Sequence, residues 1–239
     1  AELLVGLALW DRIALGVAMP VALWSDGDDL ALAGRPGEHI AGFAPGDLRL
    51  VPKFVILAPG RDGGFGLDVH VPIYLPTGDA NQFMGDDSVR ARPSLGVDWT
   101  NGDGFVIAVN LGFLLRPERV AHDYVSDDDF TWGLGVQVPL VSDLELIGSL
   151  FGSVQTRDER DPFALEEGVV SESDDARGSP IEVDAGLRYR FDAAWTLSAA
   201  AGTGITGDVG SPRFRAIVGI GFTPTERDSD GDGIEDGDD

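Results

Sequence analysis

Residues 64–75 read GFGLDVHVPIYL and alternate apolar with polar side chains. The odd-numbered positions from Leu67 to Leu75 are all apolar, whereas the even-numbered ones include Asp68, His70 and Tyr74. A period of two residues is typical of an extended strand with one apolar face. Residues 104–115, GFVIAVNLGFLL, repeat the pattern. Strands of about ten residues with one apolar face predict an all-β, transmembrane, antiparallel barrel whose apolar face contacts lipid.

The same alternation predicts eleven strands in this chain. They span residues 2–10, 12–24, 47–58, 64–75, 88–99, 104–115, 128–140, 143–156, 180–191, 194–206 and 211–222. The connections between them are alternately short, such as 192–193, and long, such as 157–179. This rhythm predicts an up-and-down barrel with short periplasmic turns and long external loops. Pro20, Pro52, Pro72 and Pro93 fall inside these strands, so we expect bulges or displaced strand ends there.

The orientation follows from the lengths of the connections. Short periplasmic turns place the C-terminal end in the periplasm and Ala1 outside the cell, in the outer membrane of a bacterium. Bacterial single-chain barrels have even strand numbers, so we expect a strand upstream of Ala1 and twelve strands in the parent protein. Residues 1–223 form the predicted barrel domain, and residues 224–239 form an acidic linker.

Composition narrows the possible partners. The 239 residues include 17 Lys and Arg against 41 Asp and Glu, a net charge of −24, which argues against nucleic acid. Cysteine is absent, which excludes disulfide scaffolds and thiolate metal sites. No apolar run reaches the roughly 18 residues that a transmembrane helix needs. The expected partner of the apolar strand faces is outer-membrane lipid.

The polar strand faces carry charges of both signs and predict a charged lumen. The i, i+2 pairs Arg90-Arg92, Arg188-Arg190 and Arg213-Arg215 either form a positive ladder that selects anions or make salt bridges that stiffen or plug the lumen, and we favour the salt bridges. The candidate lumen-lining residues are Arg49, Lys53, Asp68, His70, Arg90, Arg92, Asp98, Glu145, Glu182, Asp184, Arg188, Arg190, Arg213 and Arg215.

Catalysis needs separate consideration because some barrels are enzymes. The histidines are His39, His70 and His122, and only His70 is placed inside the barrel. His70 and Asp68 share a face and form a candidate dyad, which we interpret as a structural hydrogen-bonded pair. The sequence contains no phosphate-binding loop, dinucleotide fingerprint or metalloprotease helix, so we expect no enzymatic activity.

The C-terminal stretch DSDGDGIEDGDD, residues 228–239, has the spacing of a twelve-residue calcium loop. Gly233 stands at position 6, where such loops turn sharply, and an aspartate replaces the usual glutamate at position 12. The alternative is a solvated acidic linker. The predicted calcium ligands are Asp228, Asp230, Asp232, the carbonyl of Ile234, Asp236 and Asp239.

Three stretches carry a resemblance to a known family: GDLRLVPKFVIL (46–57), PIYLPTGDANQFMGDDSVRARPSLGVDW (72–99) and SPRFRAIVGIGFTPTERDSDGDGIEDGDD (211–239). The chain resembles OmpA-family outer-membrane proteins that carry thrombospondin type 3 repeats. The resemblance implies calcium in the tail and a following peptidoglycan-binding domain that is absent here. The expected function is then an anchor between outer membrane and cell wall. Two alternatives stay open, a narrow porin-like channel for small solutes and a secreted, soluble, calcium-binding β-sandwich.

Overall fold

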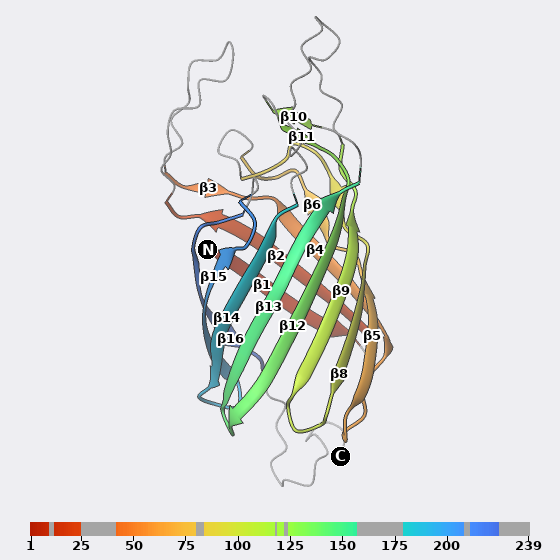
Figure 1. Ribbon diagram of the computed structural model, residues 1–239, viewed down its shortest axis with the longest axis vertical. Helices are drawn as coiled ribbons and strands as arrows, with labels where there is room; N and C mark the ends of the chain where they lie inside the picture. The colour runs from red at the N-terminus through yellow and green to blue at the C-terminus, as the bar shows by residue number, and fades with distance from the viewer. Residues whose placement is uncertain are drawn as a thin grey trace, which may run out of the picture.

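The computed structural model describes residues 1–9, 12–24, 42–79, 84–117, 119–121, 124–156, 179–207 and 211–224. Their strands form a 14-stranded antiparallel sheet that curves into a barrel wall, together with a separate two-stranded hairpin (Figure 1). The predicted fold class is confirmed. Among the described residues, no helix is both long and apolar enough to cross a membrane.

Eleven of the described strands follow one another around the wall, each antiparallel to the next. They are β1 (Glu2–Leu9), β2 (Ile13–Ala22), β4 (Leu48–Leu57), β5 (Gly64–His70), β8 (Ser94–Thr100), β9 (Val106–Leu114), β12 (Asp129–Val141), β13 (Leu144–Gln155), β14 (Ile181–Arg190), β15 (Trp195–Gly204) and β16 (Arg215–Phe222). Consecutive strands pair because each connection simply returns the chain beside the strand it has left.

Five shorter strands lie toward the end of the barrel opposite the tight turns that join β4 to β5 and β12 to β13 (Figure 1). Three of them extend the main sheet, namely β3 (Ala44–Pro45), β6 (Ile73–Leu75) and β7 (Arg90–Ala91). The other two, β10 (Arg119–Ala121) and β11 (Tyr124–Ser126), pair as a hairpin inside a stretch that the sequence predicted to be one long loop. A three-residue strand is too short to show a period of two.

Prolines interrupt two strands that the sequence predicted to be continuous. Pro72 lies between β5 and β6, and Pro93 lies between β7 and β8. Proline has no N–H to donate, but its carbonyl still accepts. The carbonyls of Pro52, Pro72 and Pro93 accept hydrogen bonds of 2.8–3.0 Å from backbone N–H groups of the neighbouring strands. The wall therefore stays connected where the strand assignment breaks, and Pro20 and Pro52 lie inside β2 and β4.

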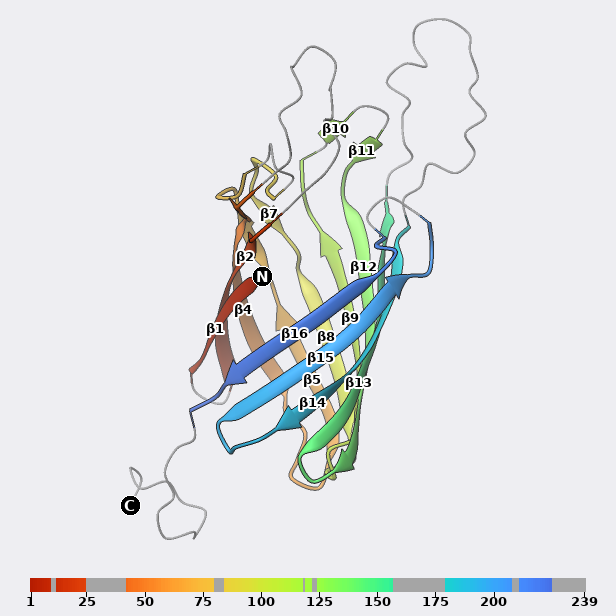
Figure 2. The ribbon, with the colours of Figure 1, turned by 90° about the vertical axis from the view of Figure 1, so that its left-hand side faces the viewer.

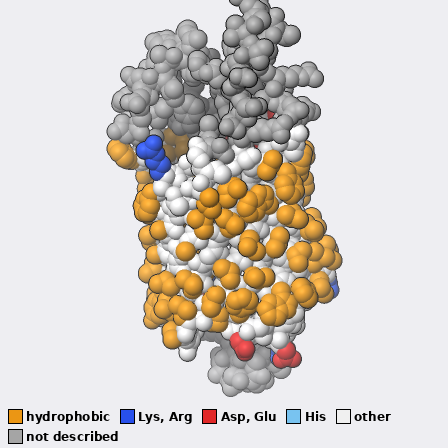
Figure 3. All heavy atoms as spheres, viewed as in Figure 1, with side chains coloured by type: hydrophobic (Ala, Val, Ile, Leu, Met, Phe, Trp, Pro, Cys, Tyr) orange, Lys and Arg blue, Asp and Glu red, His pale blue; other side chains and the backbone are white. Residues whose placement is uncertain are grey.

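The outer face of the wall is apolar. Val97, Val109, Leu134 and Leu150 are register partners on four successive strands, and the first three are 38–42% exposed. Figure 3 shows hydrophobic side chains as a broad belt on the visible face, with charged side chains near its two ends. The only buried hydrophobic residues in the described part of the chain are Ala18 and Ala44. A β-sandwich buries apolar side chains between two sheets, so the soluble sandwich is the wrong alternative.

Aromatic rings gather at the end of the barrel where the connections are short. The ring of Trp195 lies 4.8 Å from Phe222 and 6.5 Å from Phe191, and Trp99 lies 6.1 Å from Phe105. Such rings are favourable at a lipid–water boundary because one part is apolar and another polarisable or polar. They mark one edge of the lipid-facing belt.

The hydrogen-bonded order of the wall begins at β1 and ends at β16. These two strands flank the near side of the barrel in Figure 2, and no described pairing joins them. The expectation of a further strand upstream of Ala1 stays a prediction.

Candidate functional site

The candidate site is the inner face of the wall, where the register places polar residues in continuous rows. One row of cross-strand partners runs from β4 to β15, and a second runs from β5 to β16. The first row contains Val55, Asp68, Gly96, Asn110, Gly133, Phe151, Glu182 and Gly204. The second row contains Gly66, Asp98, Ala108, Gly135, Ser149, Asp184, Gly202 and Arg215.

Glycines in these rows make room for the inward carboxylates. Asp68 stands opposite Gly96, and a Cβ added to Gly96 would lie 2.6 Å from Oδ2 of Asp68. Asp98 and Asp184 stand opposite Gly66 and Gly202 in the same way. Because directly opposed side chains on one sheet face are neighbours, a large inward group needs a small partner. This arrangement explains why so many glycines lie inside strands.

We predict that Gly96→Val destabilises the barrel by roughly 1–3 kcal/mol, the usual cost of overpacking. The added methyl groups would displace Asp68 from its partners. Gly135→Val is the matched control, because nothing lies within 4 Å of a Cβ at Gly135. Denaturant unfolding of the detergent-refolded protein, followed by tryptophan fluorescence, measures the difference. Equal midpoints for the two variants would contradict this account of the glycines.

A hydrogen-bonded cluster occupies the middle of the inner wall. Asp68 accepts from Nδ1 of His70 at 2.8 Å and lies 3.0 Å from Nζ of Lys53. On the other side of the imidazole, Nε2 of His70 lies 3.1 Å from the side-chain nitrogen of Asn110. Ser94 is the register partner of His70, but its hydroxyl donates to the carbonyl of Arg92 at 3.0 Å. Both imidazole nitrogens are thus engaged, and the geometry agrees with a structural hydrogen-bonded pair.

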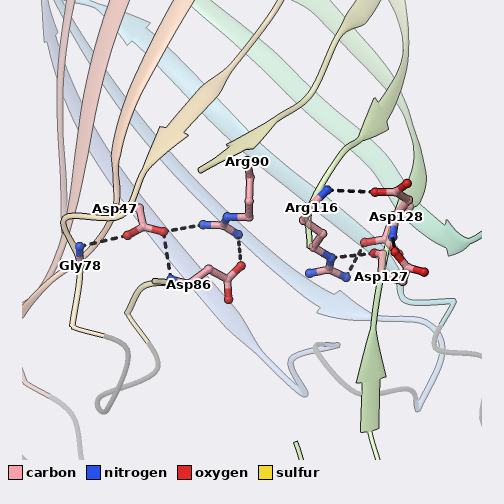
Figure 4. A network of polar contacts seen from close by, with 8 residues as sticks. Asp47, Gly78, Asp86, Arg90, Arg116, Asp127 and Asp128 are labelled. Atoms are coloured by element: carbon pink, nitrogen blue, oxygen red, sulfur yellow. Dashed lines mark hydrogen bonds and ion pairs between the residues drawn. The ribbon is translucent and has the colours of Figure 1, made fainter. Parts of the chain in front are cut away.

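A second cluster holds the connection between β6 and β7 at the barrel mouth (Figure 4). Asp47 is 4% exposed and accepts from the backbone N–H of Gly78 at 3.0 Å and of Asp86 at 3.1 Å. Its Oδ2 also accepts from Arg90 at 2.7 Å, and Arg90 pairs with the Asp86 carboxylate at 2.7 Å. The Arg90 guanidinium lies over the ring of Tyr74, 4.7 Å from its centroid.

A third cluster surrounds Arg116, beyond the end of β9 (Figure 4). The Arg116 side chain donates to the carbonyl of Asp127 at 2.7 Å and to Oδ2 of Asp129 at 2.8 Å. Its backbone N–H donates to Oδ1 of Asp128 at 2.9 Å. Sequence reasoning missed Asp47, Arg116 and Asp129, because residues at strand ends lie outside the alternating pattern that identified lumen candidates.

Most of the predicted lumen arginines have acidic partners. Glu145 lies 3.5 Å from Arg188 and 4.0 Å from Arg190, and Glu182 lies 2.9 Å from Arg215. Arg49 pairs with Glu2. In every one of these pairs the partners come from the same or nearby strands, so the pairs lie along the wall. The salt-bridge interpretation of the arginines therefore fits the described residues better than an unneutralised ladder.

Three predicted lumen residues, Arg92, Asp98 and Asp184, have no ion-pair partner among the described residues. A fourth, Arg213, precedes β16, is exposed and likewise lacks a described ion pair. The calcium ligands predicted at positions 228–239 lie outside the described residues, as do His39 and His122. Within the described part of the chain, no group of three or more acidic or histidine side chains is arranged to hold a metal ion.

Two cavities lie against the inner wall. One of about 430 Å³ lies near the end of β9 and the start of β12 and is lined by Arg92, Asn110, Leu114, Asp129, Thr131, Trp132, Gly133, Phe151, Gly152, Ser153, Pro180 and Glu182. The other, of about 370 Å³, is lined mainly by small and aliphatic residues, including Val106, Ala108, Ile147, Ala200 and Ile217. Volumes of this size suit small molecules.

The fold and inner wall define a transmembrane β-barrel of the outer-membrane type. The chain belongs to the family described as "Putative MetA-pathway of phenol degradation", which matches residues 7–215. Its structure is similar to the NanC porin (TM-score 0.62, 10% identity, covering 93% of this chain and 92% of that one). It is also similar to the COG4313 outer membrane channel from Pseudomonas putida F1 (TM-score 0.60, 17% identity, covering 92% and 79%). No curated protein matched the chain.

These comparisons correct the resemblance drawn from the sequence. The chain is not an OmpA-family protein with thrombospondin repeats, because a different family accounts for residues 7–215 and the structural neighbours are a porin and a channel. The physical reason is that the alternating strand pattern is common to outer-membrane barrels in general. The acidic tail motif indicates the character of the few residues that form it and does not indicate the family of the barrel.

Proposed function

We propose that this chain forms a passive channel for small solutes in the bacterial outer membrane. The observation that carries the proposal is the arrangement of the inward charges. Each described ion pair joins groups on nearby strands or on the segments that adjoin them, and none of them joins opposite sides of the wall. Paired charges that lie along the wall leave space in the lumen, where the two cavities are found.

Barrel size supports a narrow channel rather than a wide one. Barrels of about eight strands are filled by side chains, whereas barrels of 16 to 18 strands leave an aqueous pore. The eleven consecutive wall strands described here fall between these limits. Glycine, alanine and serine recur in the inward rows and leave more of the interior free than larger residues would. The names of both structural neighbours, a porin and a channel, agree with this function.

The orientation belongs to the same proposal. Short turns in the periplasm and long connections outside would place the C-terminal end in the periplasm, as in other outer-membrane barrels. The anchoring function has no support in the comparisons. Peptidoglycan as a partner followed only from the resemblance to the OmpA family, and calcium binding by the tail stays a prediction that a titration of the intact chain with calcium would test.

We expect the refolded chain to give discrete current steps in a planar lipid bilayer. Polar walls and unfilled space would let hydrated ions cross, and a narrow lumen would keep each step small. Swelling of arabinose-loaded liposomes gives an independent measurement of solute flux. The control is the same protein denatured by heat before addition. A protein that inserts and resists extraction, yet passes neither ions nor arabinose, would contradict the proposed channel.

A further inference from the structure

Arg92 is a half-buried arginine of the inner wall, and it differs in its partners from the other half-buried arginines there. Its neighbour Arg90 is held by Asp47 and Asp86, but Arg92 has no acidic partner among the described residues. The Nε atoms of Arg90 and Arg92 are both buried without a hydrogen-bond acceptor, but only Arg90 has carboxylate partners for its other guanidinium nitrogens. An arginine stays charged at any physiological pH, and a half-buried guanidinium without an acceptor is costly. A ligand that supplies an acceptor would remove this cost.

The cavity of about 430 Å³ is the space that Arg92 faces. The two acids that also line it are already neutralised, because Asp129 lies 2.8 Å from Arg116 and Glu182 lies 2.9 Å from Arg215. Arg92 is therefore the uncompensated charge among the described lining residues of this cavity. Counted together with their partners Arg116 and Arg215, the charged residues that line this cavity carry one excess positive charge.

The remaining lining defines what kind of anion would fit. Asn110, Thr131 and Ser153 provide neutral hydrogen-bonding groups, and the register turns Leu114 and Phe151 toward the same interior face. A carboxylate can accept two parallel hydrogen bonds from a guanidinium, and an apolar body would contact Leu114 and Phe151.

The two acids that line the cavity, Asp129 and Glu182, disfavour a ligand with more than one negative charge. A second negative group on the ligand would approach Asp129 or Glu182, whose described cationic partners, Arg116 and Arg215, are already paired with them. In a site of reduced dielectric constant, such like-charge contacts are unfavourable. The cavity is thus matched to one negative charge rather than two.

We propose that Arg92 is the binding residue of a lumen site for small monocarboxylates with an apolar body. The site deepens the proposed channel function, on which it rests, by naming the class of solute that the channel would take. Arg92 would receive the carboxylate, and Leu114 and Phe151 would contact the hydrocarbon part. Ions without an apolar part would lack the second interaction.

The test uses three four-carbon probes on the full chain in detergent micelles: butyrate, neutral butyramide and the dianion succinate. Saturation-transfer difference NMR measures binding and does not depend on conduction. We expect butyrate to bind saturably and more tightly than either control probe. Arg92→Gln should weaken butyrate binding about tenfold or more, as loss of a charge-assisted pair predicts. Arg92→Lys keeps the positive charge but loses the planar guanidinium, so its butyrate affinity should lie between those of Arg92→Gln and the unmodified protein.

Arg61→Gln is the matched control variant. It removes the same charge from an exposed residue in the turn between β4 and β5, away from the residues that line either cavity. We expect its butyrate affinity to equal that of the unmodified protein. If Arg92→Gln does not fold, as judged by its heat-modifiable gel mobility, the comparison of Arg92→Lys with Arg61→Gln decides the question.

Several outcomes would overturn the site. A folded Arg92→Gln that binds butyrate as tightly as the unmodified protein would do so, as would succinate binding equal to butyrate binding. Current steps without saturable butyrate binding would leave the channel standing and remove this inference. Butyrate binding that depends on Arg92, in a protein that conducts nothing, would support the site and overturn the proposed channel instead.

Discussion

Replacing Val109 by arginine is expected to prevent stable assembly of the barrel in a bilayer. Val109 lies near the middle of β9, between the apolar partners Val97 and Leu134, and its side chain is 39% exposed on the outer face. An arginine on the lipid-facing side of a barrel strand near the membrane midplane costs roughly 2–4 kcal/mol. Refolding into liposomes, followed by the heat-dependent shift in gel mobility, measures the assembled fraction.

The control for this substitution is Ala108→Arg, one residue away and on the opposite face. Ala108 is the register partner of Asp98, which has no described ion pair, so a new arginine there would gain a carboxylate neighbour. We expect Ala108→Arg to assemble almost as well as the unmodified chain. If it failed as severely as Val109→Arg, or if both assembled normally, the assignment of outer and inner faces would be wrong.

Asp47→Ala is expected to release the connection between β6 and β7 from the barrel mouth. The substitution removes the acceptor of three hydrogen bonds, from two backbone N–H groups and from Arg90. Removing one partner of a buried ion pair commonly costs roughly 3–5 kcal/mol. Because Arg90 keeps its contact with Asp86, we expect the lower end of this range. The free energy of unfolding in micelles provides the measurement.

Asp86→Asn separates the role of Asp47 from a general effect of charge at the mouth. It removes one acidic charge but leaves the Asp86 backbone N–H and the Asp47 carboxylate in place. The loss of stability should be well below that of Asp47→Ala, as expected for the more exposed of the two partners of Arg90. Equal losses for the two variants would show that Asp47 has no special role in holding the segment.

For the inward charges, the sequence predicted the strand face of each side chain but not its partner on the neighbouring strand. Alternation alone assigned Asp68 and His70 to the polar face of their strand, and the register places them with Lys53 and Asn110 in one cluster. The partner from the neighbouring strand could not be predicted, because a shift of one residue between strands exchanges every pairing. The proline interruptions likewise depend on which neighbouring carbonyls and N–H groups lie opposite each other.

The family assignment shows a limit of a different kind. The acidic tail resembles a calcium repeat so closely that it suggested the OmpA family for the whole chain, whereas a different family matches residues 7–215. A short motif supports an inference about the residues that form it and not about the family of the whole chain. The barrel strands follow a pattern that any lipid-facing wall requires, so they identify an architecture and not a family.

By itself, the sequence determined that this protein is an antiparallel barrel with an apolar exterior and a charged interior. The reason is that a period of two residues assigns each side chain to one face of a strand, whatever lies beside it. Only the tertiary structure decided which charges neutralise one another and that Arg92 has no acidic partner among the described residues. Pairing depends on which residues of neighbouring strands lie opposite each other, and the register between the strands decides that.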